Sequence, residues 1–439
     1  MTVDRRETDR EILRLAIPAF LALVAEPLFL LSDAAIIGHL GTRELAGLGI
    51  AGAIIQTVVG LCVFLAYGTT ASVARQIGAG DVRRAISMGI DGIWLAVVIG
   101  VVATALGIAT TPWLVSLFGA SDATSGFAVD YLQIAFLGTT PLLVMLAATG
   151  VLRGMLDTRT PLVAAVIGNL LNIGFNLVLV FGLGPIPALG IEGAAVGSVI
   201  AQVLMASILL VVVLRGARAQ DASLRPDGPG ILAAAHAGIA LVVRTLTLRA
   251  ALLVTTYAAV RAGGDTGMAA HQVAMTIWGF LAFVLDSIAI AAQALTGRRL
   301  GASDHEGTRT ITRRMVQWGI WSGIVTGIGL AALSPVLGHL FTNDRAVVEA
   351  LTPILLAAAV AQPVAGYVFV LDGVLIGAGD GAYLAWGGLA VLVVYAPLAL
   401  LTHDLVWLWI AFGIGFMGTR AVVLGLRARG DRWMVLGSA

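Results

Sequence analysis

The feature that most constrains this chain is a series of long apolar runs, each bounded by charged residues, proline or glycine. Twelve such runs lie near residues 12–37, 45–74, 86–110, 127–152, 162–183, 190–214, 231–260, 268–297, 312–334, 347–376, 381–401 and 405–427. A membrane-spanning helix needs about 20 mostly apolar residues. The runs are too long and too evenly apolar for the alternating strands of a barrel. The sequence therefore predicts an all-α integral membrane protein with twelve transmembrane helices.

The composition excludes most soluble classes of protein. Of the 439 residues, 59% are hydrophobic and only 12% are charged, whereas soluble domains carry about 25% charged residues. A cytosolic enzyme or a secreted disulfide scaffold is therefore excluded, and the single cysteine, Cys62, can form no internal disulfide. The formal net charge of +1 also argues against nucleic acid as a partner, because phosphate binding needs a basic excess.

The placement of arginine predicts the orientation of the spans. Clusters of arginine recur at alternate boundaries, from the N-terminal segment to the C-terminal one, whereas the opposite boundaries carry only Arg43, Arg261 and Arg345. Because positive residues favour the cytoplasmic side, we expect both termini to be cytoplasmic. That orientation requires an even number of spans, as twelve is.

The two halves of the chain repeat at a constant spacing of 223 residues. RQIGAGD aligns with RRLGASD, PWLVSLF with PVLGHLF, and GVLRGMLD with GVLIGAGD. We therefore expect an N-lobe at 1–214, a cytoplasmic linker at 215–230 and a C-lobe at 231–439. Each lobe would hold six helices, and a pseudo-twofold axis along the membrane normal would relate the lobes. Such repeats are typical of secondary transporters.

Three segments resemble the multidrug and toxic compound extrusion (MATE) family, and in particular its DinF branch. They are EPLFLLSDAAIIGHLG at 26–41, EGAAVGSVIAQ at 192–202 and VLDGVLIGAGD at 370–380. The resemblance implies a multidrug exporter of small amphiphilic or cationic compounds in the bacterial cytoplasmic membrane. Because two lobes in one chain need no dimer to form the cavity, we expect the protein to function as a monomer. The resemblance also implies no enzyme activity and no cofactor, with a proton or sodium gradient as the driving force. The chain contains no lysine and no GxxxxGK[ST] pattern for ATP.

Asp33 is the principal candidate for proton coupling. It lies in the first apolar run, where an ionisable side chain is costly and by default functional. Because loss of hydration disfavours a charged carboxylate, Asp33 would take up a proton from outside and release it when its site is hydrated again. By the resemblance, it matches the first-span aspartate that the DinF branch uses. The alternative is an aspartate that only caps or pairs near the helix end.

Three asparagines in the fifth run are the predicted partners of Asp33. Asn169, Asn172 and Asn176 are spaced so that they share one helix face. The resemblance implies that Asn172 and Asn176 lie near Asp33, with Ser198 close by. Some relatives carry a second carboxylate where Asn176 stands, and its absence weakens both a two-acid relay and a sodium site. The alternative is that these amides only bind helices together.

Other candidates are second choices. Glu26 precedes Pro27, whose ring should kink the first helix. Either protonation of Glu26 is coupled to bending of the helix at Pro27, or the bend is static and Glu26 is paired structurally. In the C-lobe, Thr256 corresponds to Asp33 and Arg249 to Glu26 at the same spacing. Asp286 and Asp372 are expected to pair with Arg244 and Arg249 or to line the cavity. The histidines show no metal-ligand spacing, so no metal site is predicted.

The sequence thus predicts a proton-coupled antiporter that works by alternating access. Sodium coupling is the first alternative. A lipid-linked oligosaccharide flippase of the same superfamily is the second, although it would need a strongly cationic cavity. Apart from the arginine clusters at the span boundaries, with which Arg420 is counted, only Arg244 and Arg249 stand within the spans. A channel or a membrane scaffold without coupled transport is the third. The lobed repeat and Asp33 argue against a scaffold, and no signal for a four-fold filter supports a channel.

Overall fold

The computed structural model describes residues 5–438, and these form helices and short connections. The elements in chain order are α1 (Arg5–Gly38), α2 (Thr42–Cys62), α3 (Phe64–Gly78), α4 (Val82–Ser116), α5 (Asp122–Ala135), η1 (Phe136–Gly138), α6 (Thr139–Gly154), α7 (Arg159–Phe181), α8 (Gly190–Ala219), α9 (Gly228–Gly301), α10 (His305–Phe341), α11 (Arg345–Gly377), α12 (Gly381–Leu400), α13 (Leu405–Ile410), η2 (Ala411–Gly418) and α14 (Thr419–Arg429). The outer ends of the predicted lobes, residues 1–4 and 439, lie outside the described residues.

The all-helical membrane fold is confirmed. Within residues 5–438, eleven helical segments are long and apolar enough to cross a membrane. One of them, α9, has 74 residues and is broken at Gly264, whose φ of 56° and ψ of −145° are not helical. Its two arms correspond to the predicted runs 231–260 and 268–297, which brings the spans to twelve. The two arms therefore meet at a kink at Gly264, between the two predicted runs.

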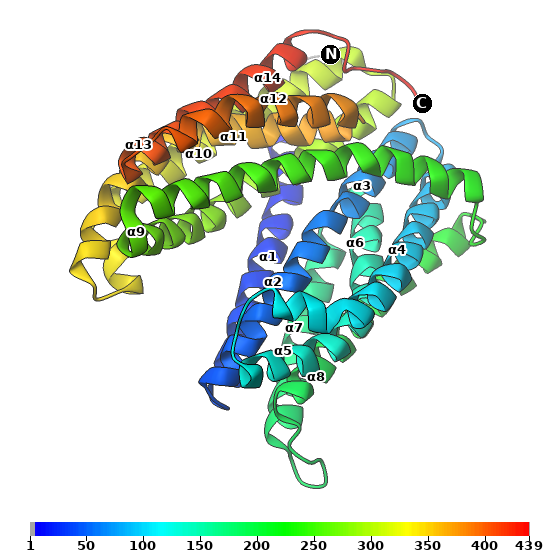
Figure 1. The fold of residues 1–439 in the computed structure, drawn as a ribbon. Helices are drawn as coiled ribbons and strands as arrows, with labels where there is room; N and C mark the ends of the chain where they lie inside the picture. The colour runs from blue at the N-terminus through cyan, green and yellow to red at the C-terminus, as the bar shows by residue number, and fades with distance from the viewer. Residues whose placement is uncertain (1–4, 439) are drawn as a thin grey trace. The chain divides into compact units, whose positions relative to one another are not determined.

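The described chain divides into two compact units. The N-terminal unit comprises Leu21–Gly238, and the C-terminal unit comprises the residues up to Phe20 together with those from Ile239 onward. Both divisions fall inside a helix, one in α1 and the other in α9 (Figure 1). The boundaries predicted for the lobes, at 214 and 230, stay a prediction.

Small residues allow the helices of the N-terminal unit to pack closely. A Cβ at Gly150 of α6 would lie 2.6 Å from the Ala66 carbonyl oxygen of α3, and the Thr70 hydroxyl of α3 donates to the Gly150 carbonyl at 3.1 Å. In a bilayer, such small-residue contacts replace the hydrophobic effect as the main source of helix association. The linker is held against α4, where Trp94 Nε1 donates to the Leu224 carbonyl at 3.1 Å.

The C-terminal unit contains a longer glycine contact, between α10 and α11. Gly319 and Gly366 face each other, and a Cβ on either would lie 2.5 Å or less from the other's carbonyl oxygen. Gly323 and Gly327, one and two turns further along α10, approach Gln362 and Ala359 of α11 in the same way. This stripe explains why α10 and α11 run side by side over their length (Figure 1).

The repeated RQIGAGD and RRLGASD segments adopt the same local structure. Asp81 accepts a hydrogen bond from the Arg84 backbone nitrogen at 2.8 Å, and Asp304 accepts one from Gly307 at 2.8 Å. Each aspartate thereby caps the start of the next helix. The glycine–aspartate turns of these segments therefore end one helix and begin another.

Candidate functional site

Asp33 is buried in the N-terminal unit, near the end of α1. Its side chain and backbone together are only 3% exposed. Asn176 of α7 donates from Nδ2 to Asp33 Oδ1 at 2.7 Å. Within residues 5–438, no ion pair involves Asp33. The carboxyl group is therefore held by a neutral donor, which is compatible with either of its protonation states.

The predicted amide face of α7 forms a continuous chain of hydrogen bonds with Asp33. Asn176 Nδ2 also donates to Asn172 Oδ1 at 3.1 Å, and Asn172 Nδ2 donates to Ser198 Oγ of α8 at 3.1 Å. Asn172 and Asn176 are fully buried. Asn169, one turn earlier on the same face, instead donates to the Ala25 carbonyl of α1 at 2.9 Å. The structure thus brings all four predicted partners to α1, three of them in one network with Asp33.

A glycine on α8 makes room for this network. A Cβ at Gly197 would lie 2.1 Å from Asn176 Oδ1 and 3.2 Å from Asn176 Cγ, so only glycine fits there. Among the described residues, Asn176 Oδ1 is buried and has no hydrogen-bond donor. An unpaired buried acceptor is costly, and here it lies beside the carboxyl group that we expect to change its charge.

Tyr131 of α5 also belongs to the site, although the sequence did not single it out. It is 6% exposed, and its hydroxyl lies within interaction range of the Asp33 carboxylate and of the Ser198 hydroxyl. Ser198 in turn lies within hydrogen-bonding reach of Asp33. The signal in the sequence that could have identified Tyr131 is its position inside an apolar run. A buried phenol hydroxyl needs a hydrogen-bond partner, so such a tyrosine predicts a polar group nearby.

Glu26 and Pro27 lie outside this network. Glu26 is on an exposed part of α1, and among the described residues it forms no ion pair. Helix α1 runs from Arg5 to Gly38 and includes Pro27. Coupling between Glu26 and a bend at Pro27 stays a prediction.

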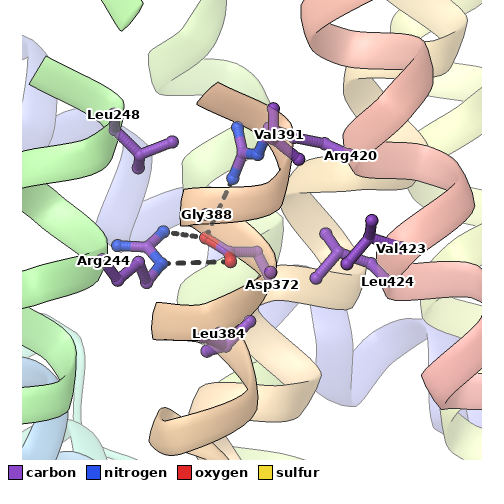
Figure 2. A pocket seen from close by; sticks show the side chains of 10 residues that line it. Arg244, Leu248, Asp372, Leu384, Gly388, Val391, Arg420, Val423 and Leu424 are labelled. Carbon is purple, nitrogen blue, oxygen red and sulfur yellow. Dashed lines mark hydrogen bonds and ion pairs between the residues drawn. The ribbon is translucent and has the colours of Figure 1, made fainter. Parts of the chain in front are cut away.

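The C-terminal unit contains a different buried carboxylate, Asp372 of α11. Arg244 of α9 binds it with both Nε and Nη2, at 3.1 Å for Nε to Oδ1, and Arg420 of α14 approaches Oδ2 to 3.4 Å (Figure 2). All three side chains are about a tenth exposed, at 10–11%. Arg244 was a predicted partner of Asp372, but Arg420 was not, since its sequence position suggested the membrane boundary.

The remaining C-lobe candidates differ from Asp372 in their surroundings. Arg249, the other predicted partner, is exposed on α9, and Asp286 is half-buried in the second arm of that helix. A cavity of about 20 Å³ adjoins Arg244, Asp372 and Arg420, which is room for about one water molecule. Among residues 5–438, no group of three or more His, Cys, Asp or Glu side chains is placed to hold a metal ion.

Comparison with known proteins places the chain among membrane transporters. A family model described as MatE matches residues 18–178 and again residues 240–401, so the predicted repeat is confirmed as two copies of one family unit. The chain is 32% identical to Protein DETOXIFICATION 44, chloroplastic, of Arabidopsis thaliana over 98% of its length and 84% of that protein. It is 28% identical to DNA damage-inducible protein F of Escherichia coli over 95% of its length and 91% of that protein.

Solved structures show the same fold. A transporter of the MOP superfamily from Pyrococcus furiosus superposes with a TM-score of 0.87 at 22% sequence identity, covering 96% of this chain and 95% of that one. At this level of identity, the likeness supports the twelve-helix, two-lobed fold and nothing finer.

Proposed function

Because the chain belongs to the MatE family, whose members are multidrug and toxic compound transporters and not enzymes, we propose that it exports small amphiphilic or cationic compounds in exchange for protons. The proton binds at Asp33. The protein is a multi-pass membrane protein, and the distribution of arginine supports a cytoplasmic membrane with both termini inside. Export by alternating access belongs to the same proposal.

The observation that carries the proposal is a buried carboxyl group without a basic partner. A carboxylate beside an arginine stays charged, but one that is surrounded by neutral groups can lose its charge by binding a proton. Asp33 is bonded to the amide of Asn176 and has no ion pair among the described residues. The hydrogen-bond network of Asn176, Asn172 and Ser198 surrounds this buried acid.

The neighbours of Asp33 accommodate both protonation states. An ionised carboxylate only accepts hydrogen bonds, and Asn176 supplies a donor. A protonated carboxyl group also donates, and hydroxyl groups can accept as well as donate. The Ser198 hydroxyl is within hydrogen-bonding reach of Asp33 and can accept the proton that Asp33 gains, and the Tyr131 hydroxyl lies within reach of Ser198. A site that accepts either state can load and release a proton without unfolding.

Sodium coupling is the second candidate, and one atom favours it. The unpaired Asn176 Oδ1 would suit a cation, since hard cations take oxygen ligands. Asp33, Asn172 and Ser198 supply further oxygens nearby. With a single carboxylate, however, the site offers less negative charge than a dense cation site does.

Dye uptake into everted membrane vesicles tests the proposal. We expect a fluorescent cationic dye to accumulate when the vesicles are energised by ΔpH without sodium, and Asp33→Asn to lose this uptake. Asp122→Asn, which alters an exposed aspartate at the start of α5, is the matched control and should keep it. Uptake that requires a sodium gradient would overturn proton coupling. Equal uptake by the wild type and Asp33→Asn would remove Asp33 from the mechanism.

A further inference from the structure

A basic pocket lies in the C-terminal unit, where the beginning of α1 meets the beginning of α10. It has a volume of about 200 Å³ and is lined by Arg5 and Thr8 of α1 with Thr310, Arg313, Arg314 and Gln317 of α10. Three guanidinium groups, two hydroxyls and an amide thus surround one space. The mechanism proposed for Asp33 uses none of these residues.

Among the described residues, Arg314 is the one of these three arginines that forms an ion pair. Arg314 donates from Nε and Nη2 to the two oxygens of Asp9, each at 2.7 Å, and from Nη1 to Gln317 at 2.9 Å. Arg5 and Arg313 are exposed, and within residues 5–438 neither has a carboxylate at ion-pair distance. Asp9 is within electrostatic range of Arg5, but both of its oxygens are bonded to Arg314. The pocket therefore keeps an excess of positive charge.

The pocket is held rigid at the level where a membrane surface is expected. Trp318 Nε1 donates to Asp9 Oδ1 at 2.8 Å, and tryptophan is enriched at membrane–water interfaces. On α1 the apolar run starts near residue 12, immediately after Asp9. Arginine distribution predicts that this side is cytoplasmic, where lipid headgroups are commonly anionic.

An apolar stripe continues from the pocket along the same face of α10. Gln317, Trp321, Val325 and Ile328 are spaced four, four and three residues apart, which places them on one side of the helix. Trp321 is 64% exposed, Val325 67% and Ile328 65%. A ligand with an anionic head and an apolar tail fits this arrangement, because the basic pocket can bind the head while the tail lies along the exposed apolar face of α10.

We propose that the pocket binds the phosphate group of an anionic phospholipid, with Arg5 and Arg313 as its main ligands and the acyl chains along Trp321, Val325 and Ile328. Arginine recognises phosphate through its planar fork of N–H donors. Basic pockets between transmembrane helices bind such headgroups in other proteins. The Thr310 hydroxyl, which is exposed at the rim, adds a further donor.

Thermal unfolding of the detergent-purified full chain with added phosphatidylglycerol tests this site. We expect phosphatidylglycerol to raise the unfolding midpoint and phosphatidylcholine to leave it unchanged. For Arg5→Gln/Arg313→Gln, the lipid affinity should fall about thirtyfold, since each arginine near a membrane surface contributes on the order of a fivefold effect. Arg429→Gln/Arg432→Gln removes two exposed arginines outside the pocket and should keep the response.

Each other outcome overturns the proposal. If phosphatidylcholine acts equally, the headgroup charge is not recognised. If inorganic phosphate gives the same shift, the site takes a free anion and not a lipid. Native mass spectrometry that counts bound phosphatidylglycerol provides a second readout, in which equal retention by Arg5→Gln/Arg313→Gln and the wild type would place the lipid elsewhere. Both variants must unfold at the wild-type midpoint without lipid, which shows that they fold.

Discussion

Asp33 in the N-terminal unit and Asp372 in the C-terminal unit are both buried carboxyl groups on membrane-spanning helices, but their partners differ in charge. Asp33 is bonded to a neutral amide, whereas Asp372 lies between two guanidinium groups. A buried acid that is paired with arginine is held in its charged form. The difference shows that the identity of a residue within a membrane is not sufficient to assign it to ion coupling, because the partner decides whether the group can titrate.

The repeat sharpens this contrast. At the spacing of 223 residues, Thr256 stands at the position of Asp33, and Tyr395 at that of Asn172. In the C-terminal unit, Tyr395 instead shares a hydrogen bond of 2.6 Å with Thr255, and Thr256 bonds to its own helix and lies 3.4 Å from His271 Nε2. Neutral hydroxyls thus join α9 and α12 in the C-terminal unit, where an acid and an amide join α1 and α7 in the N-terminal unit.

The largest expected effect is on stability, at Asp372. Asp372→Asn leaves two buried arginines without their carboxylate, which should lower the free energy of unfolding by about 3–5 kcal/mol. Asp33→Asn should cost about 1 kcal/mol or less, because the new amide can still bond its neutral neighbours. Thermal unfolding in detergent measures both. A stable Asp372→Asn protein would contradict the assignment of Asp372 to structure.

A charge-free version of the cluster completes that comparison. Arg244→Met, Asp372→Leu and Arg420→Met combined should restore most of the stability, since replacing a buried ion triad by apolar groups is often neutral or favourable. If this triple variant is stable but fails to transport, Asp372 has a functional role as well.

A smaller effect is expected at Gly197, where the close approach of α8 to Asn176 can be broken directly. Gly197→Ala forces Asn176 to move, because the new Cβ would lie 2.1 Å from its Oδ1. We expect a loss of about 1–3 kcal/mol and about a tenfold slower ΔpH-driven uptake. Gly174→Ala on α7, where a Cβ meets nothing within 4 Å, is the control. Equal uptake by the two variants would show that the geometry of Asn176 is not needed.

The smallest effect is expected at Tyr131. Tyr131→Phe keeps the ring and removes only the hydroxyl that lies near Asp33 and Ser198, at a cost of about 1 kcal/mol. If Tyr131 serves as an acceptor for the protonated state, the uptake rate should fall a few-fold while the unfolding midpoint hardly changes. An unchanged pH profile of uptake would limit Tyr131 to packing.

Much of the N-terminal site could be predicted from the sequence, because its residues obey rules that act along single helices. The three asparagines share a face by helical spacing alone, and a carboxyl group in an apolar run is conspicuous. The resemblance to MATE proteins then supplied the pairing of α1 with α7, and in the structure Asn176 Nδ2 lies 2.7 Å from Asp33 Oδ1. Their role in coupling stays a prediction.

The remaining contacts depend on packing between helices, which single-helix rules do not reach. Tyr131 comes within range of Asp33 and Ser198 through the packing of α5 beside α8. Arg420 follows the π-helix η2 and is 9% exposed, although its place near a run of arginines suggested a membrane boundary. Arg249, by contrast, lies within an apolar run and is exposed.

The division of α1 also affects the order in which the protein can be assembled. Asp9 lies early in the chain, but its partners Arg314 and Trp318 are made roughly 300 residues later. The part of α1 that carries Asp33 finds its partner Asn176 much sooner. Chains are synthesised from the N-terminus, and contacts between distant residues form late. The half of α1 that carries Asp33 can therefore pack before the half that carries Asp9. The N-terminal part of α1 can therefore complete these contacts only after α10 has been synthesised.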